Sequence, residues 1–501
     1  MPCEAVACDG FSSSRERFAT VLAWLDGDEA GGLSHGELEV RLSVEHRELF
    51  CQLIQDHLDL RAVREARLAS VCDVTGAEHR SAEAGHTRRL GTIFGEVGVE
   101  RVAYRRRGLG NLYPADAVLN LPAEKHSHGL RRLAAIEACR GSFDEAVAAI
   151  ERSVGQQIGK RQVEELTSRA AVDFADFYAA RQPPDGEAGD VLGLSCDGKG
   201  IVMRADALRP ATRKAAATTT TKLATRLSRG EKRNRKRMAE VGAVFDVRPV
   251  PRTPADILPS TDAERRTAIP GPRTHAKWLT ASVVDDAATV VAQIFDEAER
   301  RDPDHARTWV ALVDGNNHQI DRIHAEARAR QVPVAVLIDI VHVLEYLWKA
   351  AWCFHTEGDP AAETWVRRHA VTILAGGATR VAATIRRAAT RAGLNPTSRA
   401  GVETCATYLR NKRDYLDYPT ALEQGWPIAT GIIEGACRHL VKDRLDITGA
   451  RWGLPGSEAI LKLRALHANA DFDTYWHYHL HRERERIHLS RYADHAIPQA
   501  A

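Results

Sequence analysis

The stretch VLGLSCDGKGIVM, residues 191–203, decides how the rest of the chain is read. It is an apolar run with a single acidic residue, Asp197, followed at once by glycine. Small and β-branched residues on both sides of Asp197 favour a buried strand over a helix. A carboxylate in such a strand is costly to desolvate unless a cation lies against it. The stretch therefore predicts a buried strand that presents Asp197 to a positive partner.

Two later stretches repeat this signature. TWVALVDG, residues 308–315, ends an apolar run at Asp314, and IATGIIEGACR, residues 428–438, places Glu434 in another apolar element. A single Asp-Gly pair is most often a turn. Three acids in apolar elements far apart in sequence instead indicate a site that the fold assembles. We interpret them as the centre of a metal-dependent nuclease or strand-transfer core.

The chemistry of these acids points to divalent cations. Two ions about 3.5 to 4 Å apart can activate the attacking oxygen and stabilise the leaving oxygen of a phosphodiester. Mg²⁺ prefers a few carboxylates and keeps positions open for phosphate oxygens, and Mn²⁺ suits the same ligands. Asp197 is expected to bridge the ions, with Asp314 holding one and Glu434 the other.

A competing acid lies in DIVH, residues 339–342. Asp339 follows a predicted strand at 332–338 and shares one face of a starting helix with His342. The simpler interpretation is a helix N-cap and a core histidine. The alternative is that Asp339 replaces Asp314 as the second metal ligand.

Composition limits the classes of protein to consider. The chain has 501 residues, of which 44% are hydrophobic and 27% charged, as in ordinary globular proteins of about two to four domains. The net charge of +2 creates no global basic field, so nucleic-acid binding must come from local patches. No apolar run approaches the roughly 18 to 20 residues of a membrane helix, and no signal core follows the N-terminus. Nine cysteines without a CxxC pair argue against structural zinc, and a cytoplasmic protein is expected.

The N-terminal part is predicted to be a helical module at 1–85 and a DNA-binding region at 86–181. Alternating residues at 88–106 predict a hairpin with Gly95 and Gly98 at the bends. Its basic run, which includes Arg105 and Arg106, is either a solvated face or a phosphate contact.

A helix at 143–152, a turn and a second helix from residue 160 resemble a helix-turn-helix. Lys160 and Arg161 open the second helix and are predicted to contact DNA, although such helix pairs are common as plain packing. Residues 182–190 are rich in proline, glycine and acids, and they read as a linker.

Two basic segments lie near the predicted acids in sequence. Residues 222–237, KLATRLSRGEKRNRKR, contain eight Lys or Arg and one Glu. Such a block is either a flexible loop or an arm along a phosphate backbone. RLDITGARWG, residues 444–453, offers further phosphate contacts and an aromatic face for a base, with Trp452 as a core residue equally plausible. The candidate DNA contacts in these segments are Lys232, Arg233, Arg235, Lys236, Arg237, Arg444, Arg451 and Trp452.

The order of the remaining elements suggests a fold. Strands at 241–247 and 278–284 follow the first, and then come a helix at 287–300, the strand into Asp314, a helix at 318–330 and a strand at 332–338. This is the order of a ribonuclease H-like α/β core, with the helical crossovers that parallel strands need. The core is predicted at 190–354, an all-helical insertion at 355–425, and the Glu434 helix with C-terminal helices at 426–501.

The chain resembles bacterial insertion-sequence transposases of the DDE class, in particular the Kra-type group, and is distantly similar to Mutator-like transposases. The resemblance lies in CDGKG at 196–200, LVDG at 312–315, DIVH at 339–342 and GIIEGACRHLVKDRLDITGARW at 431–452. Tyr408, Asn411 and Tyr415 before Gly425 also fit it. In Mutator-like enzymes a Cys or Asp, two residues and a His follow the second catalytic acid. That match supports Asp314 as the ligand and gives Asp339 and His342 a supporting role.

The resemblance implies Mg²⁺- or Mn²⁺-dependent cleavage and joining of double-stranded DNA at the ends of an insertion sequence. It also implies a ribonuclease H-like core interrupted by helices, an N-terminal DNA-binding region, and a homo-oligomer on DNA. Two alternatives stay open. One is a structure-specific nuclease that cuts without joining, and the other is an inactive DNA-binding protein derived from a transposase.

Overall fold

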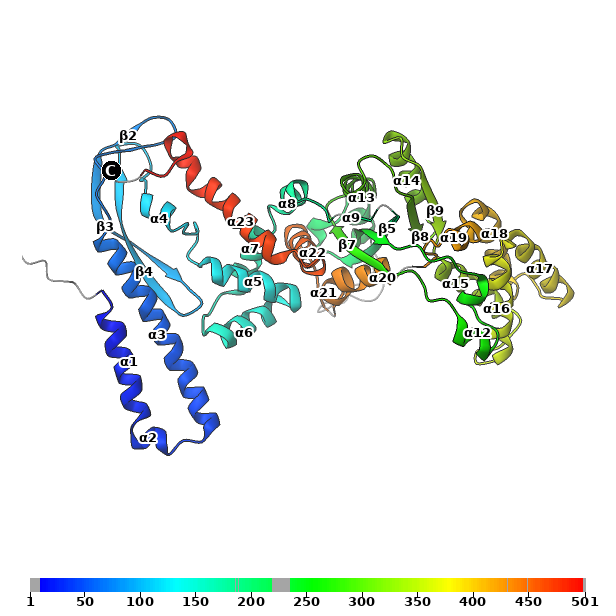
Figure 1. The fold of residues 1–501 in the computed structure, drawn as a ribbon, viewed down its shortest axis with the longest axis horizontal. Coiled ribbons are helices and arrows are strands. Elements are labelled where there is room, and N and C mark those ends of the chain that lie inside the picture. Colours follow the sequence, from blue (N-terminus) through cyan, green and yellow to red (C-terminus); the bar gives the residue numbers. More distant parts are fainter. Residues whose placement is uncertain are drawn as a thin grey trace, which may run out of the picture. The chain divides into compact units, whose positions relative to one another are not determined.

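The computed structural model describes residues 10–184, 186–187, 189–218, 235–429, 431–447 and 449–498. The predicted mixed α/β architecture with N-terminal helices is confirmed (Figure 1). The chain forms two compact units, one of Met1–Ala179 with Asp471–Ala501 and the other of Ala180–Ala470. No helix of the described residues has the length and apolar character that crossing a membrane requires.

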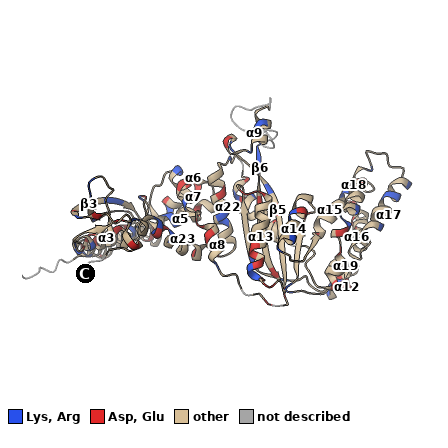
Figure 2. Cartoon of the chain, turned by 90° about the horizontal axis from the view of Figure 1, so that it is seen from above, with Lys and Arg blue, Asp and Glu red and all other residues tan. Residues whose placement is uncertain are grey.

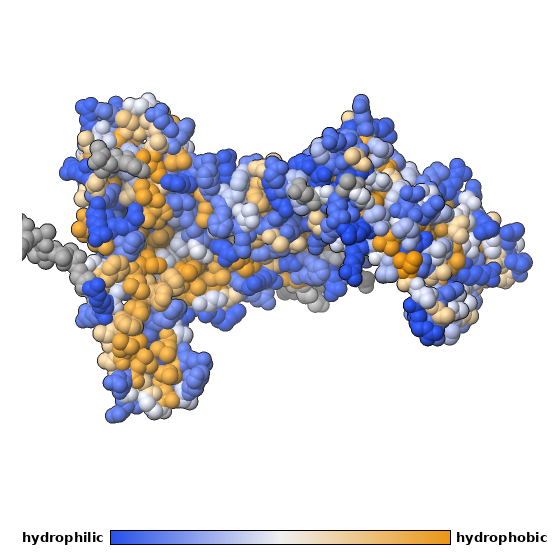
Figure 3. All heavy atoms as spheres, viewed as in Figure 1, coloured by the Kyte–Doolittle hydropathy of each residue, from blue (hydrophilic) through white to orange (hydrophobic). Residues whose placement is uncertain are grey.

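The first unit begins with a pair of helices, α1 (Ser12–Leu25) and α3 (His35–Val63), joined through the short α2 (Asp28–Gly31). Ser34 starts α3 with a capping box, in which its side chain accepts from the Glu37 N–H. The Ser14 N–H and hydroxyl both donate to Asp56, at 2.9 and 2.6 Å, and so tie α1 to α3. Apolar residues cover much of the visible surface of these two helices (Figure 3).

A long hairpin lies beside α3 (Figure 1). It consists of β3 (Ser81–Gly91) and β4 (Glu96–Arg105), and it follows the short pair β1 (Val71–Cys72) and β2 (Glu78–His79). Thr92 holds the turn, since its hydroxyl and N–H both donate to the Gly95 carbonyl. The prediction that Gly98 lies at a bend is wrong, because Gly98 pairs with Arg89 inside the ladder.

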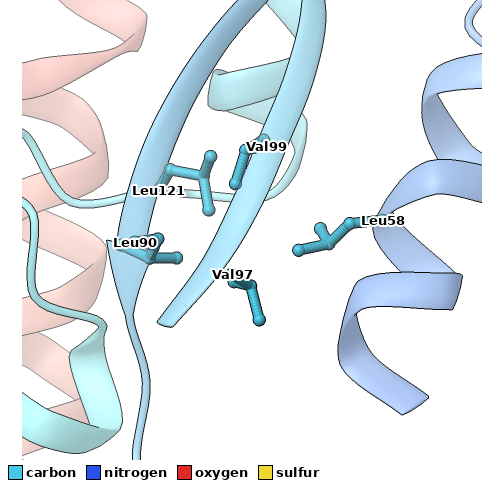
Figure 4. Close-up of a cluster of buried hydrophobic side chains, with 5 residues drawn as sticks. All are labelled: Leu58, Leu90, Val97, Val99 and Leu121. Atoms are coloured by element: carbon cyan, nitrogen blue, oxygen red, sulfur yellow. The ribbon is translucent and has the colours of Figure 1, made fainter. Parts of the chain in front are cut away.

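The core of this region joins α3 to the hairpin (Figure 4). It is formed by buried aliphatic side chains from α3, from both strands of the hairpin and from the segment after α4, namely Leu58, Leu90, Val97, Val99 and Leu121.

The rest of the first unit is helical. It comprises α4 (Pro114–Val118), α5 (His128–Arg140), α6 (Phe143–Val154), α7 (Lys160–Ala170), most of α8 (Phe174–Ala180), α23 (Phe472–Ile487) and two single turns, η4 (Leu489–Arg491) and η5 (Ala493–His495). Gly155 ends α6 in the left-handed region at φ 69°, where glycine carries no steric cost. The predicted helix, turn and second helix are therefore α6, the Gly155 cap and α7.

The second unit is built on a five-stranded sheet in the order β7-β6-β5-β8-β9. The strands are β5 (Val191–Val202), β6 (Lys236–Val247), β7 (Thr274–Ser282), β8 (Trp309–Val313) and β9 (Val334–Ile338). β5, β6 and β7 pair antiparallel, whereas β5, β8 and β9 pair parallel. The parallel connections run through α13 (Ala287–Arg301) and α14 (Asn317–Ala329).

Helices cover both faces of the sheet. α13 packs on one face, where a side chain at Gly242 would collide with Ile294. Cys196 pairs with Gly242, so alternation turns the next residue, Asp197, to the other face. That face carries α20 (Gly431–Ala436), the π-helical turn η3 (Cys437–Lys442) and α22 (Leu454–Ala468), with α21 (Asp443–Leu445) between the last two.

The predicted helical range 355–425 contains α16 (Pro360–Leu374), α17 (Ala378–Arg391), α18 (Ala400–Asn411), η2 (Arg413–Tyr415) and α19 (Tyr418–Glu423). It follows α15 (Ile340–Ala351), with which α16 and α18 pack. Shorter elements lie in the connections of the sheet, namely η1 (Ala205–Ala207), α9 (Pro210–Ala217), α11 (Pro254–Ile257) and α12 (Asp262–Thr267).

Candidate active site

The sheet brings Asp197 and Asp314 together. Parallel strands β5 and β8 are paired as far as Ser195 and Leu312. Asp197 and Asp314 each lie two residues further along, so they have the same alternation and face the same side on neighbouring strands. Such strands are about 4.8 Å apart. Both acids are half-buried, and both raise the pKa of the buried Cys196 thiol, after the larger effect of burial itself, to about 12.

The turn after β8 holds Asp314 in place. The Asp314 Oδ1 accepts from the Asn316 N–H at 2.7 Å, and Gly315 adopts φ 93°. Tyr408, from α18, donates its hydroxyl to the Asp314 carbonyl at 3.2 Å. A side chain at Gly315 would lie 2.8 Å from that hydroxyl, so glycine is needed both for its conformation and for its size.

Asp197 is held by two neutral donors. Its Oδ1 accepts from the Gly198 N–H at 2.7 Å, and its Oδ2 accepts from the Cys437 thiol at 3.3 Å. Cys437 is the first residue of η3, directly after α20. The contact shows that the segment carrying Glu434 packs on the same face of the sheet as Asp197.

Glu434 lies one helical turn before Cys437 and is exposed. The buried side chains of Ile433 and Ala436 anchor its helix, which packs against β5 and β6. Residues three apart in a helix share a face. Glu434 therefore lies close to the side of the helix that contacts Asp197, with its carboxylate in solvent.

Two further residues beside Asp197, one on each face of the sheet, were missed from sequence. Cys437 follows Glu434 by three positions, but only the packed helix shows that it contacts Asp197. Glu240 pairs with Gly198 across β5 and β6, where the missing side chain at Gly198 leaves room for it, so it lies on the opposite face of the sheet from Asp197. Burial raises the pKa of Glu240, and the Asp197 charge raises it further. The only available signal for Glu240 was the register of a hairpin whose two strands are far apart in sequence.

Lys412 is buried near Asp314, whose charge raises the pKa of that lysine against the larger lowering effect of burial. No ion pair joins Asp197, Asp314 or Glu434 to another described residue. The described residues also contain no group of three or more His, Cys, Asp and Glu side chains that could hold a metal ion as they stand. Neighbouring carboxylates repel one another. An ion would therefore have to draw the Glu434 side chain toward the two aspartates.

Asp339 directly follows β9, as Asp314 directly follows β8, and it extends the row of acids formed by Asp197 and Asp314. Val313 pairs with Ile338, so Asp314 and Asp339 are neighbours, and Asp314 lies between Asp339 and Asp197. Asp339 is buried and caps α15 by accepting from the Val341 N–H at 2.8 Å. His342 is half-buried, with its Nδ1 3.9 Å from a Glu345 oxygen. Asp339 thus has the N-cap role, and Asp314 is the nearer neighbour of Asp197.

The candidate DNA contacts of the first unit are exposed and paired with acids or carbonyls. Arg105 bonds Glu83 at 2.5 Å, and Arg106 donates to the Glu78 carbonyl at 3.3 Å. On α7, Lys160 bonds Asp144 at 2.6 Å and Arg161 bonds Glu165 at 3.0 Å. Exposed pairs of this kind are weak, so these side chains remain available to phosphates.

The second unit extends β5 and β6 as a two-stranded arm past the end of β8. Lys and Arg lie along β6 and around α9 (Figure 2). Lys236 is exposed and Arg235 half-buried, while Arg237 donates to the carbonyls of Val283 and Ala207 at 2.7 and 3.2 Å. Lys232 and Arg233 lie outside the described residues.

Two of the candidate contacts are core residues here. Arg444 is 2% exposed and Trp452 6%, with the guanidinium 4.7 Å from the centre of the ring. The Trp452 indole donates to the Leu445 carbonyl at 2.9 Å, and its backbone N–H donates to Val202 at the end of β5. Neither side chain offers a surface to DNA in this structure. Arg451, between them in sequence, is exposed.

No protein-family model matches this chain, and a search of curated proteins found no match. The function is therefore inferred from the residues and their placement. Asp197 within β5 and Asp314 directly after β8 share one face of the sheet, and both are half-buried. An exposed glutamate lies on the covering helix, and basic surface lies along β6.

Proposed function

We propose that this protein is a DDE transposase, which cleaves DNA at the ends of an insertion sequence and joins the freed 3′-hydroxyl to new DNA. The single observation that carries the proposal is the placement of Asp197 and Asp314, each two residues beyond the last pair of two neighbouring parallel strands, without an ion-pair partner among the described residues. Structural carboxylates in such positions normally have a cation from the protein itself.

The arrangement of the second unit supports a ribonuclease H-like core. Three antiparallel strands precede two parallel ones, with the first strand at the centre and helices on both faces. Four helices separate α15 from the helix that carries Glu434. This order is consistent with the interrupted core that the resemblance implies, with Asp197 on the central strand and Glu434 on a helix over it.

The donor set fits a hard divalent cation such as Mg²⁺ or Mn²⁺, since carboxylate oxygens are the ligands these ions prefer. Asp197, Asp314 and Glu434 would hold the metal, which when bound would polarise the phosphate and activate the attacking oxygen. Asp197 and Asp314 present oxygens from the rigid sheet. The exposed Glu434 can turn toward them, and Asp339 supports the row by fixing the start of α15.

The basic residues of the arm and of the first unit would hold the DNA backbone. Lys236 and Arg451 are exposed in the same unit as the acids, and Arg105, Arg106, Lys160 and Arg161 are exposed in the other unit. These contacts are independent of sequence, because they are made to phosphates. Two copies of the chain acting on paired DNA ends are expected from the resemblance.

The test is cleavage and joining of a labelled duplex that carries the DNA end bordering this protein's gene, with Mg²⁺ or Mn²⁺. Wild type is compared with Asp197→Ala, Asp314→Ala, Asp339→Ala and Glu434→Ala. We expect both reactions to be lost in the first, second and fourth variants and only reduced in Asp339→Ala. Loss in Asp339→Ala with activity kept in Asp314→Ala would move the second ligand to Asp339.

Two other results would replace the proposal. Cleavage without joined products, even from a duplex with a pre-formed 3′-hydroxyl, would indicate a structure-specific nuclease. Tight DNA binding by wild type without either reaction would indicate an inactive DNA-binding protein.

A further inference from the structure

Cys437 contacts the central acid of the candidate site from the covering helix. Its Sγ lies 3.3 Å from the Asp197 Oδ2, and the side chain is 7% exposed. The thiol faces the sheet at the point where α20 gives way to the π-helical turn η3. Single π-helical turns are rare and occur frequently at functional sites.

The π-helical turn is anchored by its own side chains and by one side chain of α22. Leu440 and Val441 belong to the turn and are buried. The Arg464 side chain, from α22, donates to the His439 carbonyl inside the turn at 2.8 Å. The turn is therefore a packed feature that fixes where Cys437 points.

The two hydrogen bonds leave room on Asp197 for a cation. Each carboxylate oxygen can accept about two hydrogen bonds or ligand contacts. Gly198 uses one position on Oδ1, and Cys437 uses one on Oδ2. The two donors bond different oxygens of the carboxylate and so restrain its rotation. One acceptor position on each oxygen is not used by these two bonds.

A thiol is suited to this task because it is a neutral, weak donor. An arginine or lysine at the same place would neutralise Asp197 and compete with a metal ion for it. We propose that Cys437 is a positioning residue, which orients Asp197 for a divalent cation without supplying positive charge of its own. This inference rests on the proposed function for its purpose, but the contact itself can be tested separately.

The first measurement is the infrared S–H stretching band of Cys437, obtained as the difference between wild type and Cys437→Ala. Nine cysteines contribute to the total signal, so the difference isolates one of them. A thiol bonded to a carboxylate absorbs at lower frequency than a free thiol. We expect that shift in wild type and its disappearance in an Asp197→Ala background.

The second measurement is the affinity for Mn²⁺ by isothermal titration calorimetry. Removing a residue that orients a metal ligand typically weakens metal binding about 10- to 100-fold, and we expect a loss in this range for Cys437→Ala. Cys437→Ser keeps a donor at nearly the same position and should recover most of the affinity. Cys405→Ala is the matched control, since Cys405 is also buried but lies on α18 in the helical range, and it should bind as wild type does.

The outcomes separate this inference from the proposed function. If Mn²⁺ binding depends on Asp197 and Cys437 but no DNA is cut or joined, the positioning role stands and the transposase proposal falls. Equal Mn²⁺ affinity in wild type and Cys437→Ala, or an S–H band unchanged by Asp197→Ala, would overturn the positioning role. A wild-type protein that binds no Mn²⁺ would overturn it as well.

Discussion

Asp173 in the first unit and Asp197 in the second differ in their hydrogen-bond donors: those of Asp173 include a cation, and those of Asp197 are neutral. Asp173 is 2% exposed and accepts from His479 at 2.6 Å and from the two terminal nitrogens of Arg486 at 2.5 and 2.8 Å. Asp197 is half-buried and accepts only from a backbone N–H and a thiol among the described residues. The first acid has its positive charge built in, whereas the second lacks one.

The same contrast separates two glutamates. Glu483, on α23, is buried and bonds Arg131, with one nitrogen-to-oxygen distance of 2.7 Å. Glu434, on α20, is exposed and has no ion pair within the described ranges. Acids that hold the fold together are paired inside the chain. The acids of the candidate site form no such ion pair within the described ranges.

The largest expected effect is on chemistry at the unpaired acids. Asp197→Asn and Asp314→Asn should each lower DNA cleavage by about 10³-fold or more, because a bound metal contributes several kcal/mol to the transition state. Neither change should lower the melting temperature, since no ion pair is broken. Single-turnover cleavage and thermal melting measure both. Full activity in either variant would remove that acid from the site.

Replacing Asp173, the acid with partners inside the protein, should instead lower stability. Asp173→Ala leaves Arg486 and His479 without their partner, which should cost about 3 to 5 kcal/mol of local stability. Hydrogen exchange in α8 and α23, read by mass spectrometry, measures this loss. Glu434→Ala is the matched control and should leave exchange in its own unit unchanged. A small effect at Asp173 would erase the contrast between the two acids.

Added metal should stabilise only the unit with unpaired acids. At about 100 times the dissociation constant, Mg²⁺ or Mn²⁺ should add about 2.7 kcal/mol to the unfolding free energy of that unit. Slower exchange in β5 and β8 would report it, and Asp197→Asn should abolish the effect. Equal protection of α23 would show that the ion acts at some other place.

Lowering the pH should weaken the contact of Asp173 with His479 and Arg486 within a defined pH range. Burial raises the pKa of Asp173, but the hydrogen bonds from His479 and Arg486 outweigh it and lower the pKa to about 2 from an unfolded value of 3.8. The resulting stability, about 2 kcal/mol, is complete above the unfolded pKa and is lost as pH falls through the folded one. Unfolding of α23 followed between pH 5 and pH 2, against Asp173→Asn, should show a flatter profile in the variant. Parallel profiles would contradict the pairing.

The smallest expected effect concerns DNA binding by surface charges. Lys160→Ala and Arg161→Ala should each reduce the slope of log affinity against log salt by about 1, without changing sequence preference. Arg132→Ala, at a half-buried arginine of α5 that bonds Asp473, is a charge-matched control and should leave the slope unchanged. Fluorescence anisotropy over a range of salt concentrations measures all three. An unchanged slope in the first two variants would exclude α7 from the DNA interface.

Sequence patterns predicted the strands of the second unit and their order because apolar runs alternate with clear turn signals, whereas β1 and β2 lie in a range predicted to be helical. Asp197 and Asp314 could be predicted as neighbours, since Asp197 lies within one apolar strand, Asp314 follows another, and helical crossovers imply parallel pairing. The mixed α/β architecture is confirmed, and its identity as a ribonuclease H-like core remains a proposal.

Other features depend on packing that no local pattern encodes. Glu240 comes next to Gly198 through the register of two strands far apart in sequence. Cys437 reaches Asp197 through a π-helical turn, which has no sequence signature. The backbone of Trp452 forms a bridge with Met203, directly after β5, and its side chain is buried. The basic residues around it in sequence gave no sign of this burial.

Fe²⁺-directed cleavage of the polypeptide tests most directly whether one metal site includes all three acids. Fe²⁺ with ascorbate and peroxide cuts the backbone beside the bound ion, and mass spectrometry locates the cuts. We predict cuts beside Asp197, Asp314 and Glu434 that Mg²⁺ suppresses and that Asp197→Ala abolishes. Cuts confined to other segments, or cuts at these three that persist in Asp197→Ala, would contradict the assignment of this site.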